Sequence, residues 1–545
     1  MQIESAVTAL YNRAELCCKL ALDERCGDET LLEQAYAVWG ERCPEYLLGD
    51  FAFCLYDEKR GCFFCARDPL GIKPLYYTTK ANHYYFANDL DTLFHRSQVE
   101  KRLNKEMMIS LLHQDEVSYE TTMYEGVYRL PPGHWMIVEK GQKQLYRYWR
   151  PETIKVNYQI TKAEAATRFK ELFDNAIQCR INDPDTTAFE LSGGLDSSSI
   201  VSSLAHKEKI HHVYTMRFGK LSCDEGEYID TVVSKYDLVP KSLRIDQTDY
   251  NAQYDMAFNY NVNPHWPILV TYTMIFPLME QMKRDGISTI ITGQGGDHIL
   301  TGNPHVLTEL LKRFKLIELI LNLYRIPKRR NKIRNYLVLP FLGKKTKILL
   351  KLLLRRRSKI DCQEVRHEES VAKRTQKFSP AFAYDLDTVT GPLHALMMDA
   401  SAFHAIEKHF GVEYRHPFFD VRLVEFMLSM PPWFKYGQGR TKHLLRIAMQ
   451  GILPEKIRNR EDKAEFSEVL LQQIDAIDLP SLLDASQMVS KGWIAQEEID
   501  TLYDKYCNQV LSAADILRFW RYINVEYWYR HTFVGEHGST GSPRT

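Results

Sequence analysis

Residues 190–200 read ELSGGLDSSSI, and this stretch decides how the second part of the chain folds. Two adjacent glycines allow a tight turn that brings backbone N–H groups against an anion. Serine hydroxyls and the dipole at the start of a following helix favour the same negative charge. An acidic residue inside an anion cradle is costly unless it binds a cation, so Asp196 is interpreted as a Mg²⁺ ligand. The predicted anion-binding loop consists of Ser192, Gly193, Gly194, Leu195, Asp196, Ser197 and Ser198.

This loop resembles the pyrophosphate-binding loop of enzymes that split ATP between its α and β phosphates and transfer AMP to a substrate. It has no lysine where a loop of the G-x-x-x-x-G-K-S type has one. The alternative is an ordinary glycine-serine turn, which the long match disfavours. The loop therefore predicts an enzyme that uses ATP and Mg²⁺ to form an adenylate.

Strands and helices are predicted to alternate around the loop, as in a parallel α/β sheet. The expected strands cover 187–191, 212–218 and 287–292, and the expected helices 162–181 and 197–205. The third strand leads into TGQGGD (Thr292–Asp297), at the sheet edge where ligands bind. Asp196 and Asp297 are therefore expected to face one another across Mg²⁺ and pyrophosphate. A purely structural Asp297 is the alternative, which the two preceding glycines disfavour.

The first part of the chain is rich in short apolar and aromatic runs, which predict β-strands over 47–56, 61–66, 84–87 and 135–139. A rigid turn, RDPLGIKPLYY (Arg67–Tyr77), and an LPPGH run (Leu130–His134) connect them. These motifs, with Tyr148-Trp149, resemble the glutamine-amidotransferase half of asparagine synthetases. ELSGGLDSSSI, TGQGGD and the late R-x-x-K-x-x-F (Arg460, Lys463, Phe466) are similar to their synthetase half.

The resemblance implies two domains. Residues 1–152 are expected to form an α+β N-terminal-nucleophile-like sandwich, degenerate and shortened. Residues 153–545 are expected to form an α/β parallel-sheet PP-loop ATP pyrophosphatase domain with a basic helical insertion at about 305–375. Nucleotide contacts implied by the resemblance are the loop itself with Met216, Thr292, Gly293 and Lys442.

The N-terminal domain departs from the family at the residues that hydrolyse glutamine. Asparagine synthetases have a cysteine after the initiator methionine, where this chain has Gln2. Val7, Thr8 and Ala9 fall where the family has Asn-Gly-Glu, and apolar groups cannot stabilise an oxyanion. No glutaminase activity is expected, and the opening strands before Tyr11 are expected to be missing.

The amine must then belong to the substrate, as in lasso-peptide cyclases, β-lactam synthetases and carbapenam synthetases. The run GVEYRHPFFDVRLVEFMLSMPP (residues 411–432) and YNRAEL (Tyr11–Leu16) resemble the cyclases. The predicted function is therefore a lasso-peptide macrolactam synthetase, in which a peptide Asp or Glu is adenylated and the peptide's N-terminal amine closes the ring. Its expected partners are a leader-free core peptide, a leader peptidase and a leader-binding protein. Alternatives are a small-molecule amide synthetase, ammonia-dependent or β-lactam-forming, and a non-catalytic scaffold.

Three catalytic candidates follow from the motifs. Lys463 is expected to stabilise charge on the α-phosphate or the tetrahedral oxyanion. Gln294 stands where asparagine synthetases have glutamate and β-lactam synthetases tyrosine, and it cannot accept a proton. An N-terminal amine, with a pKa of roughly 7.7–8.0, can arrive neutral. Glu413 is the third catalytic candidate and is expected to line the pocket with His416, although a buried structural histidine is the alternative for His416.

Composition excludes several classes of function. Lys and Arg equal Asp and Glu, 70 against 70, so no global charge points to nucleic acid. The 11 scattered cysteines suit reduced thiols in the cytoplasm, and no signal peptide or apolar run of about 18 residues is visible. The stretch 311–359 has Glu318 as its only acid. It predicts basic amphipathic helices that contact a membrane surface, a processing partner or the peptide, or else a solvated basic face.

Overall fold

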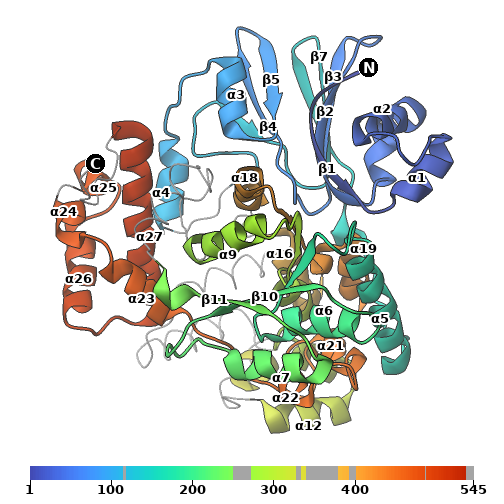
Figure 1. Cartoon of the computed structure of the whole chain (residues 1–545), viewed down its shortest axis with the longest axis vertical. Coiled ribbons are helices and arrows are strands. Elements are labelled where there is room, and N and C mark those ends of the chain that lie inside the picture. The colour runs from blue at the N-terminus through green and yellow to red at the C-terminus, as the bar shows by residue number, and fades with distance from the viewer. Residues whose placement is uncertain are drawn as a thin grey trace.

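The computed structural model describes residues 1–113, 118–248, 272–326, 333–338, 378–391, 400–484 and 486–535. It contains an N-terminal domain built on antiparallel sheets and a C-terminal domain built on a parallel sheet with helices (Figure 1). The last N-terminal strand ends at Arg147, and the first parallel strand begins at Thr187.

A five-stranded antiparallel sheet of order β1-β2-β3-β7-β8 forms the centre of the N-terminal domain, and a three-stranded sheet of order β5-β4-β6 lies against it. Cys54, Cys65 and Met136 belong to the apolar layer between the two sheets. Helices α1 and α2 cover the outer face of the large sheet through Leu31, Phe51 and other apolar side chains, and α3 packs on the small sheet (Figure 1). The strands are β1 (Gln2–Leu10), β2 (Gly49–Asp57), β3 (Cys62–Arg67), β4 (Tyr76–Lys80), β5 (His83–Ala87), β6 (Val127–Arg129), β7 (His134–Glu139) and β8 (Gln142–Arg147), and the helices are α1 (Arg13–Leu20), α2 (Asp28–Trp39), α3 (Leu90–Ser97) and α4 (Lys105–His113).

The opening strand corrects one expectation. Residues 2–10, where strands were expected to be missing, form β1, which pairs antiparallel with β2 from Gln2↔Tyr56 to Leu10↔Gly49. An edge strand of this kind is held by its backbone ladder, so it needs little of the apolar alternation by which a strand is recognised in sequence.

The C-terminal domain has a five-stranded parallel sheet of order β11-β10-β9-β12-β13, which places β9 at its centre. Such sheets are covered by helices on both faces. On one face, α5, α6, α19 and α21 pack on Phe189 and Ile291; on the other, α9 and α18 pack near Ala188 and Ile290. The strands are β9 (Thr187–Glu190), β10 (His212–Arg217), β11 (Lys241–Arg244), β12 (Thr289–Ile291) and β13 (Glu413–Arg415).

The helices of this domain begin with α5, whose start is fixed by a capping box between Thr161 and Glu164. The last five helices, α23 to α27, contribute apolar side chains to the same core as α9 and α18. The described helices are α5 (Lys162–Gln178), α6 (Leu195–Ala205), α7 (Gly226–Tyr236), α9 (Tyr272–Arg284), α10 (Gly296–Leu300), α11 (Val306–Lys312), α12 (Leu316–Arg325), α16 (Pro380–Thr390), α18 (Ala400–Phe410), α19 (Val421–Ser429), α20 (Pro432–Lys435), α21 (His443–Ala448), α22 (Glu455–Arg458), α23 (Ser467–Asp475), α24 (Leu479–Asp484), α25 (Gln487–Ser490), α26 (Gln496–Cys507) and α27 (Ala513–Tyr529).

Only part of the basic stretch 311–359 lies within the described residues, namely the end of α11, α12 and residues 333–338. The rest of the expected insertion at 305–375 lies mostly outside them. Among the described residues, no helix has the length and apolar character needed to cross a membrane.

Candidate active site

Two glycine-containing loops meet at the carboxyl edge of the parallel sheet. They follow β9 and β12, which are neighbours in register from Thr289↔Thr187 to Ile291↔Phe189. The first loop leads into α6, with Gly194 at its N-cap, and the second leads into α10, with Gly295 at its N-cap. The exposed N–H groups of α6 therefore point at the same edge where the second loop ends.

A buried lysine joins the acidic residues of the two loops. The Nζ atom of Lys442 lies 2.6 Å from Asp196 Oδ2 and 2.7 Å from Asp297 Oδ1. Lys463 contacts the other oxygen of Asp297 at 2.5 Å, but its side chain is 77% exposed against 10% for Lys442. The structure thus brings together the two predicted carboxylates and both predicted lysines, with Lys442 at the centre of the group.

Glycine is required for this close approach. A Cβ atom on Gly296 would lie 2.3 Å from Asp196 Cγ, and one on Gly293 would lie 2.7 Å from the backbone nitrogen of Ser197. Gly193 has φ +83°, a conformation that L side chains rarely adopt. The glycines of the two motifs thus allow the loops to touch.

The charges of the group depend on one another. Burial raises the pKa of Asp196, and the charge of Lys442 offsets part of that effect. Burial also acts to raise the pKa of Asp297, but Lys442 and Lys463 outweigh it and hold that pKa well below its ordinary value. Burial disfavours the charged form of Lys442, yet the two carboxylates raise its pKa. The group therefore holds two cations and at least one firmly ionised carboxylate at neutral pH.

The donor set fits a magnesium ion that is shared with a phosphate. Magnesium binds through one or two carboxylates together with phosphate oxygens and water. Asp196 and Asp297 supply the two carboxylates, and the buried Oδ1 of Asp196 has no hydrogen-bonding partner within the described residues. No larger group of metal-ligating side chains occurs in that part of the chain. A site that depends on these two residues needs oxygens from a ligand to complete it.

The predicted serines hold the shape of the first loop. Ser192 Oγ and Ser197 Oγ lie 2.8 Å apart, and Ser192 Oγ accepts a hydrogen bond from the Gly194 N–H at 3.3 Å. Arg460 is buried; it donates to the Gly193 carbonyl at 3.3 Å and forms an ion pair with Glu225. We assign Arg460 a positioning role for the loop.

A cavity of about 270 Å³ opens beside the two loops. It contains four of the predicted residues: Ser192, Met216, Thr292 and Gln294. The remaining wall is mostly apolar and includes residues that the sequence motifs did not single out for this site. These are Phe218, Cys223, Glu225, Met274, Ile275, Leu278, Ile290 and Phe403; Glu190, Tyr414 and Phe466, which belong to the quoted motifs, complete the wall.

His416 supports the second loop from outside the cavity. Its Nδ1 lies 2.9 Å from Thr292 Oγ1, and it is buried. Burial lowers the pKa of His416 to about 3, so the imidazole is neutral at pH 7. This agrees with the structural alternative for His416.

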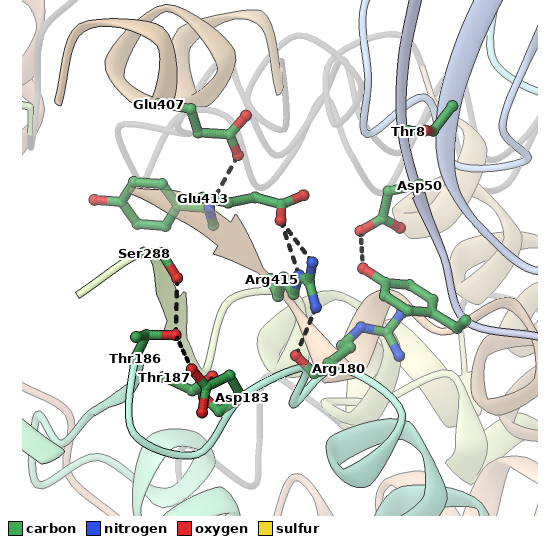
Figure 2. Close-up of polar contacts among 12 residues, drawn as sticks. Thr8, Asp50, Arg180, Asp183, Thr186, Thr187, Ser288, Glu407, Glu413 and Arg415 are labelled. Carbon is green, nitrogen blue, oxygen red and sulfur yellow. Dashed lines mark hydrogen bonds and ion pairs between the residues drawn. The ribbon is translucent and has the colours of Figure 1, made fainter. Parts of the chain in front are cut away.

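Glu413 lies elsewhere, in a buried network between the two domains. Figure 2 shows it beside Arg415, whose guanidinium contacts Glu413 at 2.7 Å and the Arg180 carbonyl at 2.9 Å. Lys73 of the N-terminal domain lies 3.4 Å from Glu413 and 2.9 Å from Glu407. The structure does not bring Glu413 to the loops or the cavity, because β13 directs it toward the other domain.

A second part of this network lies at β2. Tyr11 donates a hydrogen bond to Asp50 at 2.5 Å, and the Arg180 guanidinium stacks 4.0 Å from the Tyr11 ring centre. Arg180 also forms a buried ion pair with Asp420 at 2.9 Å. The sequence did not predict this network, because its residues come from both domains and are far apart along the chain.

The fold and site define a class: an α/β domain in which a glycine-serine loop meets two carboxylates and two lysines at the sheet edge, joined to an antiparallel β domain. The asparagine synthase family model matches residues 168–530, and a glutamine amidotransferase domain model matches residues 8–149. The chain therefore belongs to the asparagine synthase family, a family of ATP-dependent amide-forming ligases that use ATP with Mg²⁺.

Curated relatives are similar over much of the chain. Asparagine synthetase 3 (glutamine-hydrolyzing) of Bacillus subtilis is 25% identical over 530 residues, which cover 88% of this chain and 80% of that protein. A putative asparagine synthetase 2 of Methanocaldococcus jannaschii is 25% identical over 307 residues, covering 54% and 57%. A protein named Amidase chry2, of Gibberella zeae, is 27% identical over 287 residues, covering 49% and 42%.

Proposed function

We propose that this protein is a lasso-peptide-type macrolactam synthetase. A peptide Asp or Glu carboxylate oxygen attacks the α-phosphorus of ATP, forming an acyl-adenylate and releasing pyrophosphate. The peptide's N-terminal amine then attacks the acyl carbon, forming the isopeptide bond and releasing AMP and a proton. The observation that carries the proposal is Gln294 in the wall of the cavity, where a residue that cannot accept a proton favours an amine that arrives neutral.

The chain's own residues support the adenylation step. The N–H groups at the start of α6 would hold the phosphates, and Lys442 and Lys463 would meet negative charge that develops at the α-phosphate. Asp196 and Asp297 would hold Mg²⁺, which neutralises the departing pyrophosphate when bound.

The N-terminal domain supports a reaction that is independent of glutamine. Val7, Thr8 and Ala9 form regular β1 pairs with Ala52, Phe51 and Asp50, so their backbone is committed to the sheet. The ion pairs of the domain's buried Lys73 with Glu407 and Glu413 of the synthetase domain are consistent with a structural role. A leader peptidase and a leader-binding protein remain proposed partners.

A surface on α12 supports the proposal that the basic stretch contacts an anionic membrane. Its exposed apolar side chains follow helical spacing from Phe314 through Ile317 and Leu321 to Tyr324. Lys312, at the end of α11, and Arg325, at the end of α12, flank this surface, and their positive charges complement anionic headgroups.

The test is the intact mass of a leader-free core peptide encoded beside the gene, after incubation with the protein, ATP and Mg²⁺. Loss of one water, with AMP and pyrophosphate formed in step, is expected. An unchanged peptide, with AMP formed from aspartate and ammonia instead, would show a small-molecule amide synthetase. Absence of AMP with every acceptor would indicate a scaffold.

Asp196→Ala is expected to abolish AMP formation and leave the thermal unfolding temperature within a few degrees of wild type, because its carboxylate contacts glycine and lysine at the site edge. Asp230→Ala, on the exposed side of α7, is the matched control and should retain the wild-type rate. An unchanged rate in Asp196→Ala would contradict the magnesium assignment.

A further inference from the structure

Glu190 ends the central strand of the parallel sheet, immediately before the anion-binding loop. Side chains alternate between the two faces of a strand, so Glu190 lies on the same face as Ala188. The residues in register with Ala188 across β12 and β13 are Ile290 and Tyr414, and both line the 270 Å³ cavity. The Glu190 side chain therefore points into that cavity.

Glu190 is an unpaired acid in a mostly apolar wall. The other acid of the cavity, Glu225, forms an ion pair with Arg460. The Glu190 side chain has no hydrogen bond or ion pair with any residue in the described ranges of the chain. Carboxyl groups are rarely left in this state unless a ligand supplies the partner.

The remaining titratable groups of the cavity do not supply a positive charge or a hydrogen bond to Glu190. Burial raises the pKa of the Cys223 thiol to about 11, so this thiol is neutral. The Tyr414 hydroxyl donates to Met279 Sδ at 3.2 Å. Burial alone raises the pKa of Glu190 to about 7, with no contribution from a neighbouring charge. At pH 7 the carboxyl is therefore divided between its neutral and ionised forms.

We propose that Glu190 recognises the nucleobase of the bound nucleotide. The inference rests on the proposed function, which puts the phosphates on the loop that begins at Ser192. Ser192 and Thr292 belong to both the loops and the cavity, so the nucleoside enters this cavity when the phosphates are bound. Its volume of about 270 Å³ lies just below the range of about 300–1,000 Å³ that is usual for ligand pockets, which limits it to one nucleoside-sized group. Met216, Phe218 and Leu278 offer apolar contacts to a purine.

The chemistry of the carboxyl then selects the base. A neutral carboxyl has one O–H donor and a carbonyl acceptor, which match adenine N1 and its N6 amino group. An ionised carboxylate has only acceptors, which match the N1–H and N2 amino groups of guanine instead. Neutral Glu190 thus favours ATP, and ionisation weakens that preference.

The experiment is equilibrium binding of Mg²⁺ with ATP, GTP or purine riboside triphosphate, which lacks the N6 amino group, at pH 6.0 and pH 8.5. It needs no peptide. Wild type is expected to prefer ATP over purine riboside triphosphate by about tenfold or more at pH 6.0, the effect of one hydrogen bond. The preference for ATP over GTP should fall at pH 8.5, where Glu190 is ionised.

Two variants make the test sharp. Glu190→Gln keeps one donor and one acceptor at every pH, so it should retain the preference for ATP and lose its pH dependence. Glu190→Leu should bind the three nucleotides with similar affinity. Full ATP preference in Glu190→Leu would overturn the inference. So would loss of the preference for ATP in Glu190→Gln, because this side chain keeps one donor and one acceptor.

The two proposals can fail separately. If wild type discriminates nucleotides as expected but leaves the core peptide unchanged, the role of Glu190 stands and the macrolactam function is wrong. If wild type binds no nucleotide, both are wrong.

Discussion

At the scale of single residues, the site is organised by Lys442 rather than by the more exposed Lys463. Its ammonium lies between two carboxylates that would otherwise repel one another across the loops. Because Lys442 has little exposure, its charge is poorly screened and acts strongly on a nearby phosphate. Removing it changes both the charge of the site and the distance between its loops.

Lys442→Ala is therefore expected to lower the rate of ATP-dependent pyrophosphate release by about 10²–10³, the effect of removing a preorganised charge-stabilising group. Lys463→Ala should reduce the rate less, by about tenfold, because solvent competes for its exposed ammonium. Steady-state release with the core peptide measures both. Lys456→Ala, which removes an exposed ion pair with Glu227, is the control. Equal losses in Lys442→Ala and Lys463→Ala would contradict this ranking.

At the scale of elements, α12 exposes several large apolar side chains to solvent. Phe314 before the helix is 84% exposed, and Ile317 and Tyr324 within it are 73% and 77% exposed. On the opposite side, Leu319 and Asn322 are buried, and Asn322 accepts a hydrogen bond from the Gly439 N–H at 3.0 Å. The helix is thus anchored by one face and has an apolar stripe on the other.

Ile317→Asp combined with Tyr324→Asp is expected to reduce binding to vesicles of phosphatidylglycerol and phosphatidylcholine by tenfold or more, since about 1.4 kcal/mol of apolar burial suffices for that change. Vesicle cosedimentation at low and high salt measures it. Val239→Asp removes a still more exposed apolar side chain outside α12, and this variant should bind like wild type. If the wild-type protein does not cosediment, α12 is not a membrane contact.

At the scale of the whole molecule, the two domains are joined by buried charges. Lys73 lies in the RDPLGIKPLYY turn of the first domain and contacts Glu407 on α18 of the second. Burial acts to raise the pKa of Glu407, but Lys73 and His404 outweigh it and lower that pKa to about 2. The carboxylate is thus stabilised in the folded state relative to the unfolded one. This contribution is complete above the ordinary pKa of about 4.3 and is lost as the pH falls toward 2.

Lys73→Met is expected to lower the free energy of unfolding by about 3–5 kcal/mol, because it leaves the buried Glu407 without its lysine partner. Urea unfolding at pH 7 measures the loss. Adding Glu407→Gln should restore part of it, whereas Glu407→Gln in the wild-type background should remove part of the decline in stability between pH 4 and pH 2. Arg168→Met, the control, removes an exposed ion pair with Glu171 and should lower the free energy of unfolding by at most about 1 kcal/mol. A loss in Lys73→Met no larger than this would show that the pair does not stabilise the domain contact.

Much of the fold and half of the site could be predicted from local sequence. ELSGGLDSSSI and TGQGGD are each continuous, and the physics that they encode is local: tight turns, helix starts and strand ends. Both loops lie at one sheet edge, and Asp196 and Asp297 converge as expected. The antiparallel domain followed by a parallel one was also predictable, because periodicity and turn residues are read over short windows.

Other features were decided by the tertiary structure. The strand β1 has only a weak sequence pattern, and it is stabilised by its backbone hydrogen bonds to β2, which the sequence does not reveal. Glu413 belongs to the domain contact, although it is adjacent in sequence to a cavity residue, because alternate residues of a strand face opposite ways. Glu190 gains its role because apolar side chains from segments that are distant along the chain line the same cavity. Sequence alone determined which residues form turns, which begin helices and which carry charge. Packing decided which of those charges are buried, paired or accessible to a ligand, because burial depends on contacts between segments that are distant along the chain.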